Sequence, residues 1–316
     1  MNKTKVKNVK KAALNNAVYI FGIAIIAFFS FASEHFFTSA NGITIFRSST
    51  LMLSIGIGMT FALLVGELDL SVGANCRFAA SVAALLMVHG GWNPYLCMIL
   101  MPVLGGLVGL VNGLLVTRVN LNAWLVTLSM KLVLVGVVVK LTNTVAINMP
   151  QEVLQFRNMK IFGMSSFIIF ILVVMLLMQM ILKFTPFGRK LVAVGSDAKA
   201  AQKLGIPVKN YKLAAFVISG LFAGLGGMLI SINLGSITRE LGDGYEFTAV
   251  AAVVLGGVSL AGGEGSVFPK AFAGVLILTV IENGLTMLGA DIYMFQIAKA
   301  VIIFVMMYID SIKHKI

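Results

Sequence analysis

The sequence predicts an all-α polytopic membrane protein with about ten transmembrane or re-entrant helices. Hydrophobic residues make up 59% of the 316 residues and charged residues only 11%, against about 45–50% and about 25% in soluble domains. The mean hydropathy of +0.99 is more than one core can absorb, so lipid must cover much of the surface. Runs such as FIIFILVVMLLMQMIL, residues 167–182, lack the alternating polarity of a membrane β-strand. Helices satisfy their own backbone hydrogen bonds and are therefore the expected spanning elements.

Ten apolar stretches follow one another along the chain. Two of them, 78–89 and 246–261, fall short of the roughly 20 residues that a straight crossing needs. We expect broken or re-entrant helices at both places. One transmembrane domain, 17–310, would lie between a basic cytoplasmic N-terminus, 1–16, and a cytoplasmic tail, 311–316. The stretches are 17–33, 44–65, 78–89, 95–117, 123–142, 164–182, 213–234, 246–261, 267–288 and 294–309.

The lysines and arginines indicate the orientation. With the N-terminus inside, ten crossings place both termini and most of the 24 basic residues in the cytoplasm, including Arg77 and the loop 183–212. Arg47, Arg157 and Arg239 then lie outside. The net charge of +12 would suggest nucleic acid in a soluble protein, but this positive-inside distribution accounts for it, and no nucleic-acid partner is expected.

The loop 183–212 contains a short predicted helix in SDAKAAQKLGIP. Ser196 is the expected N-cap, and Asp197 complements the positive helix end. Gly205 and Pro207 end the helix. It is too short to be stable alone, so something must hold it. It either rests with its basic neighbours on anionic lipid headgroups or inserts into a partner protein, and its alanine-rich faces favour insertion.

Two carboxylates lie at the end of the second apolar stretch, in LLVGELDLSVGANCRF. Asp69 and Ser71 are residue types that begin helices, and Glu67 or Asp69 could pair with Arg77. The favoured interpretation is structural, with the turn capping a broken helix and neutralising a local charge. A gating role is the alternative, because the turn lies between spans that must move.

Glycines predict close helix packing, since small residues at intervals of four let helices approach in lipid. Gly105, Gly109 and Gly113 show this spacing, as do Gly220 and Gly224. GELDLSVG and GGVSLAGG also share Gly, Leu and Gly at equal positions, as in a two-repeat transporter. The motif and gating candidates are Gly66, Asp69, Ser71, Gly73, Gly256, Gly257, Gly262 and Gly263.

Polar residues within predicted spans are costly and often line a transport path. Helix packing or an interfacial position is the alternative for each of them. Lys131 could pair with Glu282, although nothing in the sequence places the two together. The pathway candidates are Asn112, Lys131, Asn233, Glu282 and Asn283.

Three stretches together resemble the permease subunits of bacterial ABC sugar importers of the ribose, xylose and galactose type. GELDLSVG is similar to the family's Asp-Leu-Ser-x-Gly signature. GGLVGLVNGLLVTRVNLNAWLVTL, 105–128, is similar to its Gly-Leu-x-Asn-Gly segment, and GYEFTAVAAVVLGGVSLAGGEGSV, 244–267, to its AAVVLGG stretch. The loop 183–212 stands where the family carries the coupling helix that contacts the ATPase. The resemblance covers roughly residues 44–310.

The sequence departs from the family pattern at three places. Glu67 replaces a usual glycine, as in branched-chain amino-acid permeases, and 122–124, Asn-Ala-Trp, stands where Pro-Phe is common. Lys199 or Ala198 occupies the usual glutamate position of the coupling helix. The first two departures bear on substrate identity and the third on pairing with the ATPase.

The resemblance implies a type II ABC importer-like bundle in a bacterial plasma membrane. It would be a transporter subunit, not an enzyme, and would move a small polar solute, in first place a monosaccharide. The chain has no G-x-x-x-x-G-K-[ST] motif, so ATP and Mg²⁺ are expected on a separate ATPase. No cofactor or metal is expected in this chain. The candidate ATPase contacts are Ser196, Asp197, Ala198, Lys199, Ala200, Ala201 and Gly205.

The resemblance also implies an extracytoplasmic substrate-binding protein and a second permease copy, identical or a close paralogue. Charges at the outer side, in the loop 235–247 and at Arg47, Arg157 and Arg239, are candidates for docking the binding protein; an ordinary solvated loop is the alternative. Other solutes remain open, namely a branched-chain amino acid, a nucleoside or an autoinducer-type furanose. An ion-coupled secondary transporter is the alternative class.

Overall fold

The structure is a computed structural model that describes residues 3–161 and 164–315, so residues 1–2 and 316 of the two predicted cytoplasmic ends lie outside it. Helices form most of the described chain, which confirms the all-α prediction. Four two-residue strands form two small antiparallel pairs, β1 with β4 and β2 with β3. The elements are α1 Lys3–Ala32, α2 Ser39–Leu64, α3 Val72–Val88, α4 Pro94–Thr117, α5 Ala123–Thr142, β1 Ile147–Asn148, α6 Gln151–Asn158, β2 Lys160–Ile161, β3 Met164–Ser165, α7 Ser166–Phe184, α8 Pro186–Ser196, α9 Ala198–Lys203, α10 Val208–Leu234, β4 Ser236–Ile237, α11 Tyr245–Leu255, a π-helical turn Val267–Ala271, α12 Phe272–Met287 and α13 Ile292–Lys315.

Within the described residues, six helices are long and apolar enough to cross a membrane: α2, α4, α5, α7, α10 and the π-helical turn continued by α12. Four shorter apolar helices, in α1, α3, α11 and α13, coincide with the remaining apolar stretches of the sequence. The chain is therefore a polytopic membrane protein.

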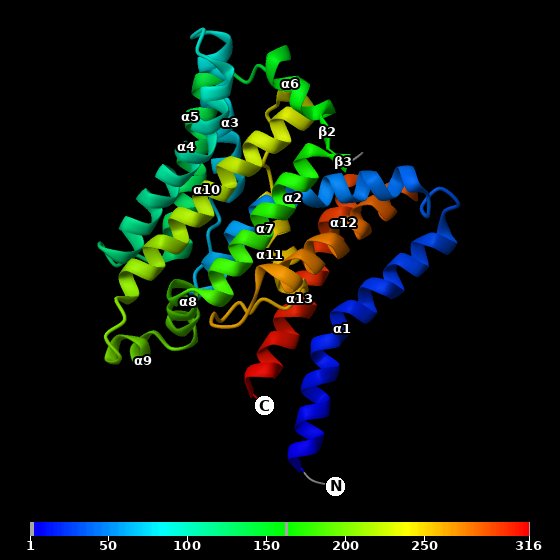
Figure 1. The fold of residues 1–316 in the computed structure, drawn as a ribbon, viewed down its shortest axis with the longest axis vertical. Coiled ribbons are helices and arrows are strands. Elements are labelled where there is room, and N and C mark those ends of the chain that lie inside the picture. The colour runs from blue at the N-terminus through cyan, green and yellow to red at the C-terminus, as the bar shows by residue number, and fades with distance from the viewer. Residues whose placement is uncertain (1–2, 162–163, 316) are drawn as a thin grey trace.

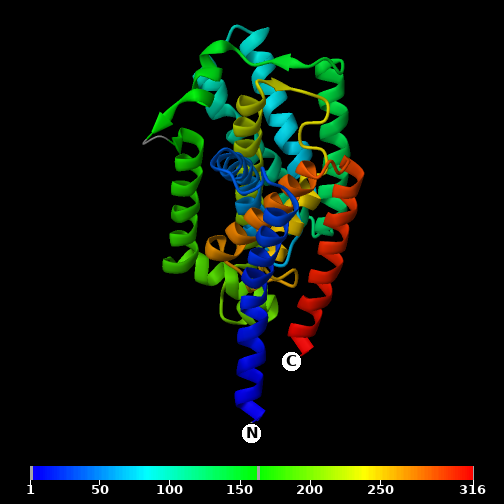
Figure 2. The same cartoon turned by 90° about the vertical axis from the view of Figure 1, so that its right-hand side faces the viewer.

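The helices are arranged with α2 lying across the bundle, whereas α7 and α10 run along it (Figures 1 and 2). Most of α2 and α10 is buried, while α4, α5 and α7 expose most of their length. Most of their exposed side chains are large and apolar, for example Leu107 on α4 and Leu176 on α7. Such a surface is suited to hydrocarbon.

The glycine spacing brings α4 and α10 into backbone contact. A Cβ on Gly105 would collide with the carbonyl oxygen of Gly220, and one on Gly224 would collide with that of Met101. Gly109 meets the Phe216 carbonyl in the same way. The prediction of close packing through these glycines is confirmed.

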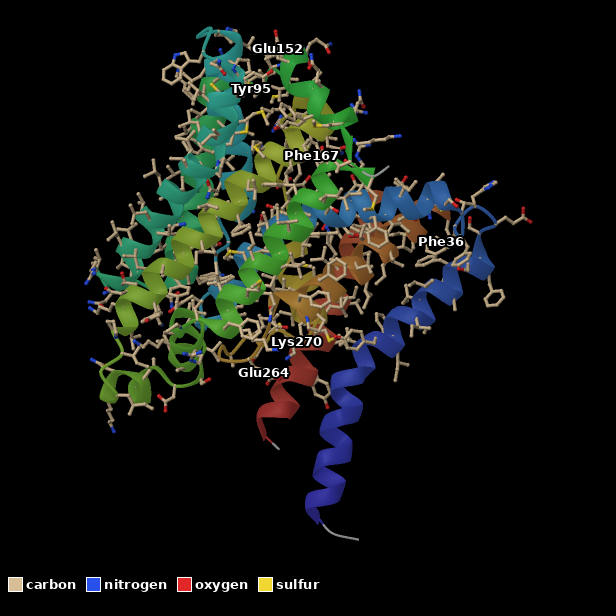
Figure 3. The ribbon with its side chains drawn as sticks, in the orientation of Figure 1. Phe36, Tyr95, Glu152, Phe167, Glu264 and Lys270 are labelled. Carbon is tan, nitrogen blue, oxygen red and sulfur yellow. The ribbon has the colours of Figure 1, made fainter. Side chains whose placement is uncertain are left out.

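The two ends of the bundle differ. The start of α1, the end of α13 and the short helices α8 and α9 lie at one end, hereafter the α9 end (Figures 1 and 2). At the opposite end, Tyr95 on α4 packs edge-on against Phe156 on α6, with ring centroids 6.0 Å apart. Figure 3 shows Tyr95 and Glu152 there, far from Glu264 and Lys270.

The third helix is longer than the stretch 78–89 predicted, because α3 begins at Val72. Its first turns carry Arg77 into the bundle, where the side chain is 7% exposed. Arg77 donates a hydrogen bond to the backbone carbonyl of Arg239, in the loop that the predicted topology places outside. The expectation that Arg77 lies on the inner side is therefore wrong.

Candidate coupling and transport site

The short helix predicted in the loop 183–212 is present as α9, although its cap differs by one residue. Asp197, not Ser196, is the N-cap, and its carboxylate accepts hydrogen bonds from Lys199 N at 2.9 Å and Ala200 N at 3.0 Å. Ser196 instead ends α8. Gly205 follows with φ +76°, a conformation that favours glycine and ends the helix.

One side of α9 packs onto the bundle and the other is open. Ala201 is only 3% exposed and packs against the rest of the protein, whereas Leu204 at the end of α9 is 80% exposed. Phe187 on α8 stacks on Tyr211 on α10 with centroids 5.6 Å apart, which holds the loop against the bundle. Leu204 was not among the predicted contact residues; a leucine beside a helix-ending glycine was its only signal.

The end of α8 contacts both glycine motifs. A Cβ on Gly195 would collide with the carbonyl oxygen of Leu64 and approach Gly263 N at 2.6 Å. Gly263 N donates to the same Leu64 oxygen at 3.0 Å, and a Cβ on Gly262 would lie 2.8 Å from Gly66 N. The segments 64–66, 195–196 and 261–263 thus meet backbone to backbone; we call this contact the glycine knot.

Several motif glycines are required by their surroundings. Gly66, Gly257, Gly262 and Gly263 adopt φ between +71° and +94°, where side chains with a Cβ are strained. Gly73 instead faces the Gly242 carbonyl at a distance that leaves no space for a Cβ. These glycines are therefore required by the backbone conformation or by close backbone contacts. This finding is consistent with both the structural and the gating role predicted for the turn.

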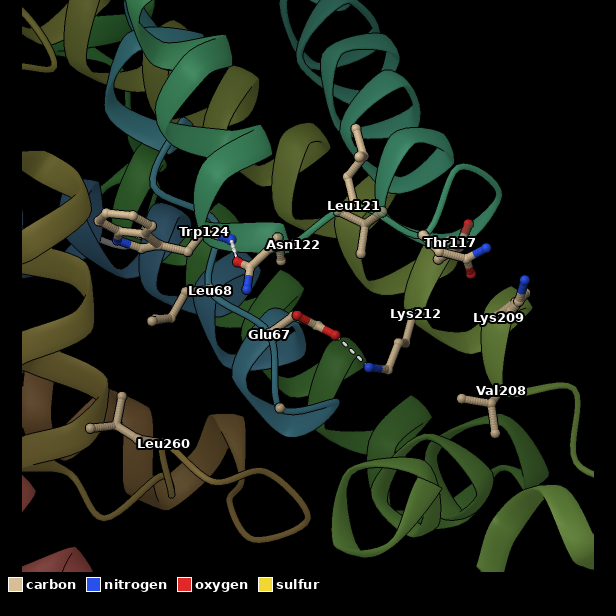
Figure 4. A pocket seen from close by; sticks show the side chains of 14 residues that line it. Glu67, Leu68, Thr117, Leu121, Asn122, Trp124, Val208, Lys209, Lys212 and Leu260 are labelled. Atoms are coloured by element: carbon tan, nitrogen blue, oxygen red, sulfur yellow. Dashed lines mark hydrogen bonds and ion pairs between the residues drawn. The ribbon is translucent and has the colours of Figure 1, made fainter. Parts of the chain in front are cut away.

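Glu67 forms an ion pair with Lys212 on the first turns of α10 (Figure 4). The side chains are 16% and 26% exposed, respectively. The suggested partner Arg77 lies elsewhere, as described above. The ion pair therefore ties the turn after α2 to the helix that follows α9.

Asp69 is fully buried and organises a polar network among three segments. Its Oδ1 accepts from the backbone and the hydroxyl of Ser71, at 3.0 and 2.6 Å, and its Oδ2 accepts from Ser219 of α10 at 2.8 Å. Asn112 of α4 donates to Ser71 Oγ at 2.9 Å. The network joins α3, α4 and α10 where the short span begins, in keeping with the predicted structural role.

Lys131 forms an ion pair with Glu246 on α11, not with Glu282. Glu246 is fully buried, and its Oε2 is without a partner among the described residues. Close by on α11, Thr248 accepts a hydrogen bond at 3.2 Å from Lys299 of α13, which is itself buried. These groups form a polar region shared by α5, α11 and α13.

The remaining candidates are dispersed. Asn283 exchanges amide hydrogen bonds of 2.9 and 3.0 Å with Asn41 of α2, so it joins two helices. Asn233 is half-buried near the end of α10, and Glu282 is exposed on the isolated chain. Arg47 donates to the Arg157 carbonyl at 3.3 Å, which brings two docking candidates together.

The arrangement is suited to mechanical work. The described residues bring no three His, Cys, Asp or Glu side chains together as a metal-binding group. They do bring together the exposed helix α9, the glycine knot and the Glu67–Lys212 ion pair. Together these features connect the surface to the turn before α3 and the turn after α11. A displacement of α9 would be passed on to these turns, because few side chains lie between them that could absorb the movement.

Comparison with known proteins gives consistent relatives. The family model described as "Branched-chain amino acid transport system / permease component" matches residues 41–309. The chain is 33% identical over 277 residues to the D-allose transport system permease protein of Escherichia coli (strain K12), covering 87% of this chain and 84% of that protein. It is 33% identical over 301 residues to the ribose import permease protein of the same strain, covering 92% of each. Identity to the galactose/methyl galactoside import permease protein of Haemophilus influenzae is 31%, covering 95% of this chain and 94% of that protein. No solved structure matches the chain. The chain therefore belongs to the family of the branched-chain amino acid transport system permease components.

Proposed function

We propose that this chain is the membrane-spanning permease subunit of an ATP-driven importer for a monosaccharide. The relatives support this reading, because their names assign them to the import of D-allose, ribose and galactose. The ATPase is a separate polypeptide that binds ATP and Mg²⁺, and an extracytoplasmic binding protein delivers the sugar. The alternative solutes of the sequence analysis are less well supported, since the relatives named here carry sugars.

The glycine knot is the observation that carries the mechanism. Leu64 and Gly263 share a hydrogen bond of 3.0 Å, and Gly195 leaves no space for a side chain against them. An ATPase that grips α9 and moves it therefore moves the end of α8, and the end of α8 moves both turns. The proposed ATPase-facing residues are the exposed ones of α9 and its C-cap, namely Lys199, Ala200, Gln202, Lys203 and Leu204.

The turns at the knot lead to the groups that would line the path. The turn after α2 begins α3 and holds Asp69, and the turn at 261–263 follows α11, which carries Glu246 and Thr248. Rocking of α3 and α11 would alter the polar region around Lys131 and Lys299. Charged groups at membrane depth usually face such a path.

The assembly follows from the same reading. The α9 end is cytoplasmic, the chain crosses the membrane ten times, and residues 17–310 form one domain. A second copy completes the path. Arg47 and Arg157, which lie together, and Arg239 face the binding protein, where such charges set register and association rate.

ATP-driven uptake in proteoliposomes tests the proposal. The complex purified through a tag on this chain should contain an ATPase, and with its binding protein it should accumulate D-ribose, D-allose or D-galactose only when ATP is present. Accumulation by the chain alone under an ion gradient would favour a secondary transporter. Uptake of leucine without uptake of any sugar would contradict the assigned substrate.

A further inference from the structure

A cavity of about 550 Å³ opens beside the Glu67–Lys212 ion pair (Figure 4). It lies between the end of α4, the start of α5 and the start of α10, with Leu260 after α11 at one side. Sites for small molecules usually measure about 300–1,000 Å³. The cavity is therefore large enough for a monosaccharide together with some water.

The polar groups of this cavity come from separate segments. Asn122 begins α5, and its Oδ1 accepts from Trp124 N at 2.9 Å. Because the Oδ1 atom caps the helix, the Nδ2 group of Asn122 is left to donate elsewhere. No described residue accepts a hydrogen bond from it. Glu67 and Lys212 add a carboxylate and an ammonium group within the same space.

An apolar side completes the cavity. The side chain of Trp124 is 52% exposed, and it lies with Leu68 and Leu260 on one side of the ion pair (Figure 4). An aromatic ring offers a large flat apolar face. A pyranose or furanose has hydroxyl groups around its rim and carbon-bound hydrogens on its faces, which match such a mixture of ring, amide and charge.

Glu67, in the turn after α2, and Trp124, in the first turn of α5, both line this cavity. The residues lie more than 50 positions apart in the sequence, yet they line one space.

We propose that this cavity is a low-affinity monosaccharide site at the exit of the transport path. Trp124 stacks on a face of the sugar, while Asn122 donates to a hydroxyl and Glu67 accepts from one. The site rests on the proposed function and adds to it a place, at the α9 end, where this chain itself contacts its substrate. Gly66 belongs both to the glycine knot and to the lining of this cavity. A movement that displaces the knot would therefore also open and close the site.

Tryptophan fluorescence tests the site directly, because the chain has two tryptophans and Trp92→Phe leaves Trp124 alone. The full chain in nanodiscs would be titrated with D-ribose, D-allose and D-galactose, and with sorbitol as the control. We expect a saturable change with a midpoint in the millimolar range for at least one sugar and none for sorbitol. Asn122→Asp keeps an oxygen cap for α5 but removes the amide donor, and it should raise the midpoint at least fivefold.

Three results would overturn the site: a linear response that sorbitol reproduces, an unchanged midpoint in both Asn122→Asp and Glu67→Gln, or a response to anionic phosphatidylglycerol but to no sugar. ATP-driven uptake by the complex separates the two proposals. Normal sugar uptake without a saturable signal removes only the exit site. Absence of uptake of every monosaccharide by the unaltered complex removes the proposed function.

Discussion

Leu204 provides the sharpest test of the coupling surface. The side chain is 80% exposed at the end of α9, so its truncation costs the folded chain little. If an ATPase covers it, Leu204→Ala removes three carbons from the interface. At about 0.8 kcal/mol per buried methylene, scaled by the exposed fraction, the loss is about 2 kcal/mol, or roughly 25-fold in affinity.

The measurement is the dissociation constant between the ATPase and the full chain in nanodiscs, by interferometry. Leu234→Ala is the matched control, because Leu234 is 54% exposed at the far end of α10. We expect the control to change affinity by less than about twofold, with both variants keeping the melting temperature of the unaltered chain. Equal affinities for Leu204→Ala and the unaltered chain would refute the assignment of α9 as the ATPase contact.

Three further predictions concern stability and coupling. Gly195→Ala forces a methyl group against a carbonyl oxygen at the end of α2 and should destabilise the chain by about 1–3 kcal/mol; an unchanged melting temperature would show that the knot is loose. Lys131→Met leaves the Glu246 carboxylate buried without its cation and should lower the free energy of unfolding by about 3–5 kcal/mol. Adding Glu246→Gln to the same chain should restore most of this loss. A lower melting temperature for the double variant than for Lys131→Met would argue against the ion pair. A double-mutant cycle of Glu67→Gln and Lys212→Gln should give a coupling energy of no more than about 1 kcal/mol that falls in high salt, and a salt-independent value would contradict a partly exposed ion pair.

The features that local sequence dictates were the ones that could be predicted. Continuous apolar runs specify membrane helices because a helix satisfies its backbone within one segment, whereas a membrane β-strand would show alternating polarity. The spacing of the glycines in α4 and α10 was enough to predict close packing, since residues four apart share a helix face. Gly205 ends α9 as predicted, because left-handed turns favour glycine. At the other end the N-cap is Asp197 and not the predicted Ser196, since serine and aspartate are both capping residue types.

Partners far apart in the sequence could not be predicted in this way. Glu67 is 145 positions from Lys212, and Lys131 is 115 positions from Glu246. The sequence suggested Arg77 as a partner for Glu67 and Glu282 for Lys131, but the tertiary packing brings other residues to both. Arg77 was misplaced for a related reason: an apolar count begins α3 after the arginine, whereas the helix starts at the turn before it.

The direct backbone contacts of the glycine knot bear on how motion would pass through it. Side chains between two moving elements can change rotamer and absorb a displacement, but backbone atoms in direct contact cannot. Where Gly195 meets the end of α2 and Gly263, a shift of the α8–α9 segment must therefore carry both turns along or break the contact. The two turns lead to different helices, α3 and α12, so one push at the α9 end reaches both sides of the bundle together. In the proposed function the ATPase is a separate polypeptide that acts through α9, and such a stiff connection would carry its movement to both turns.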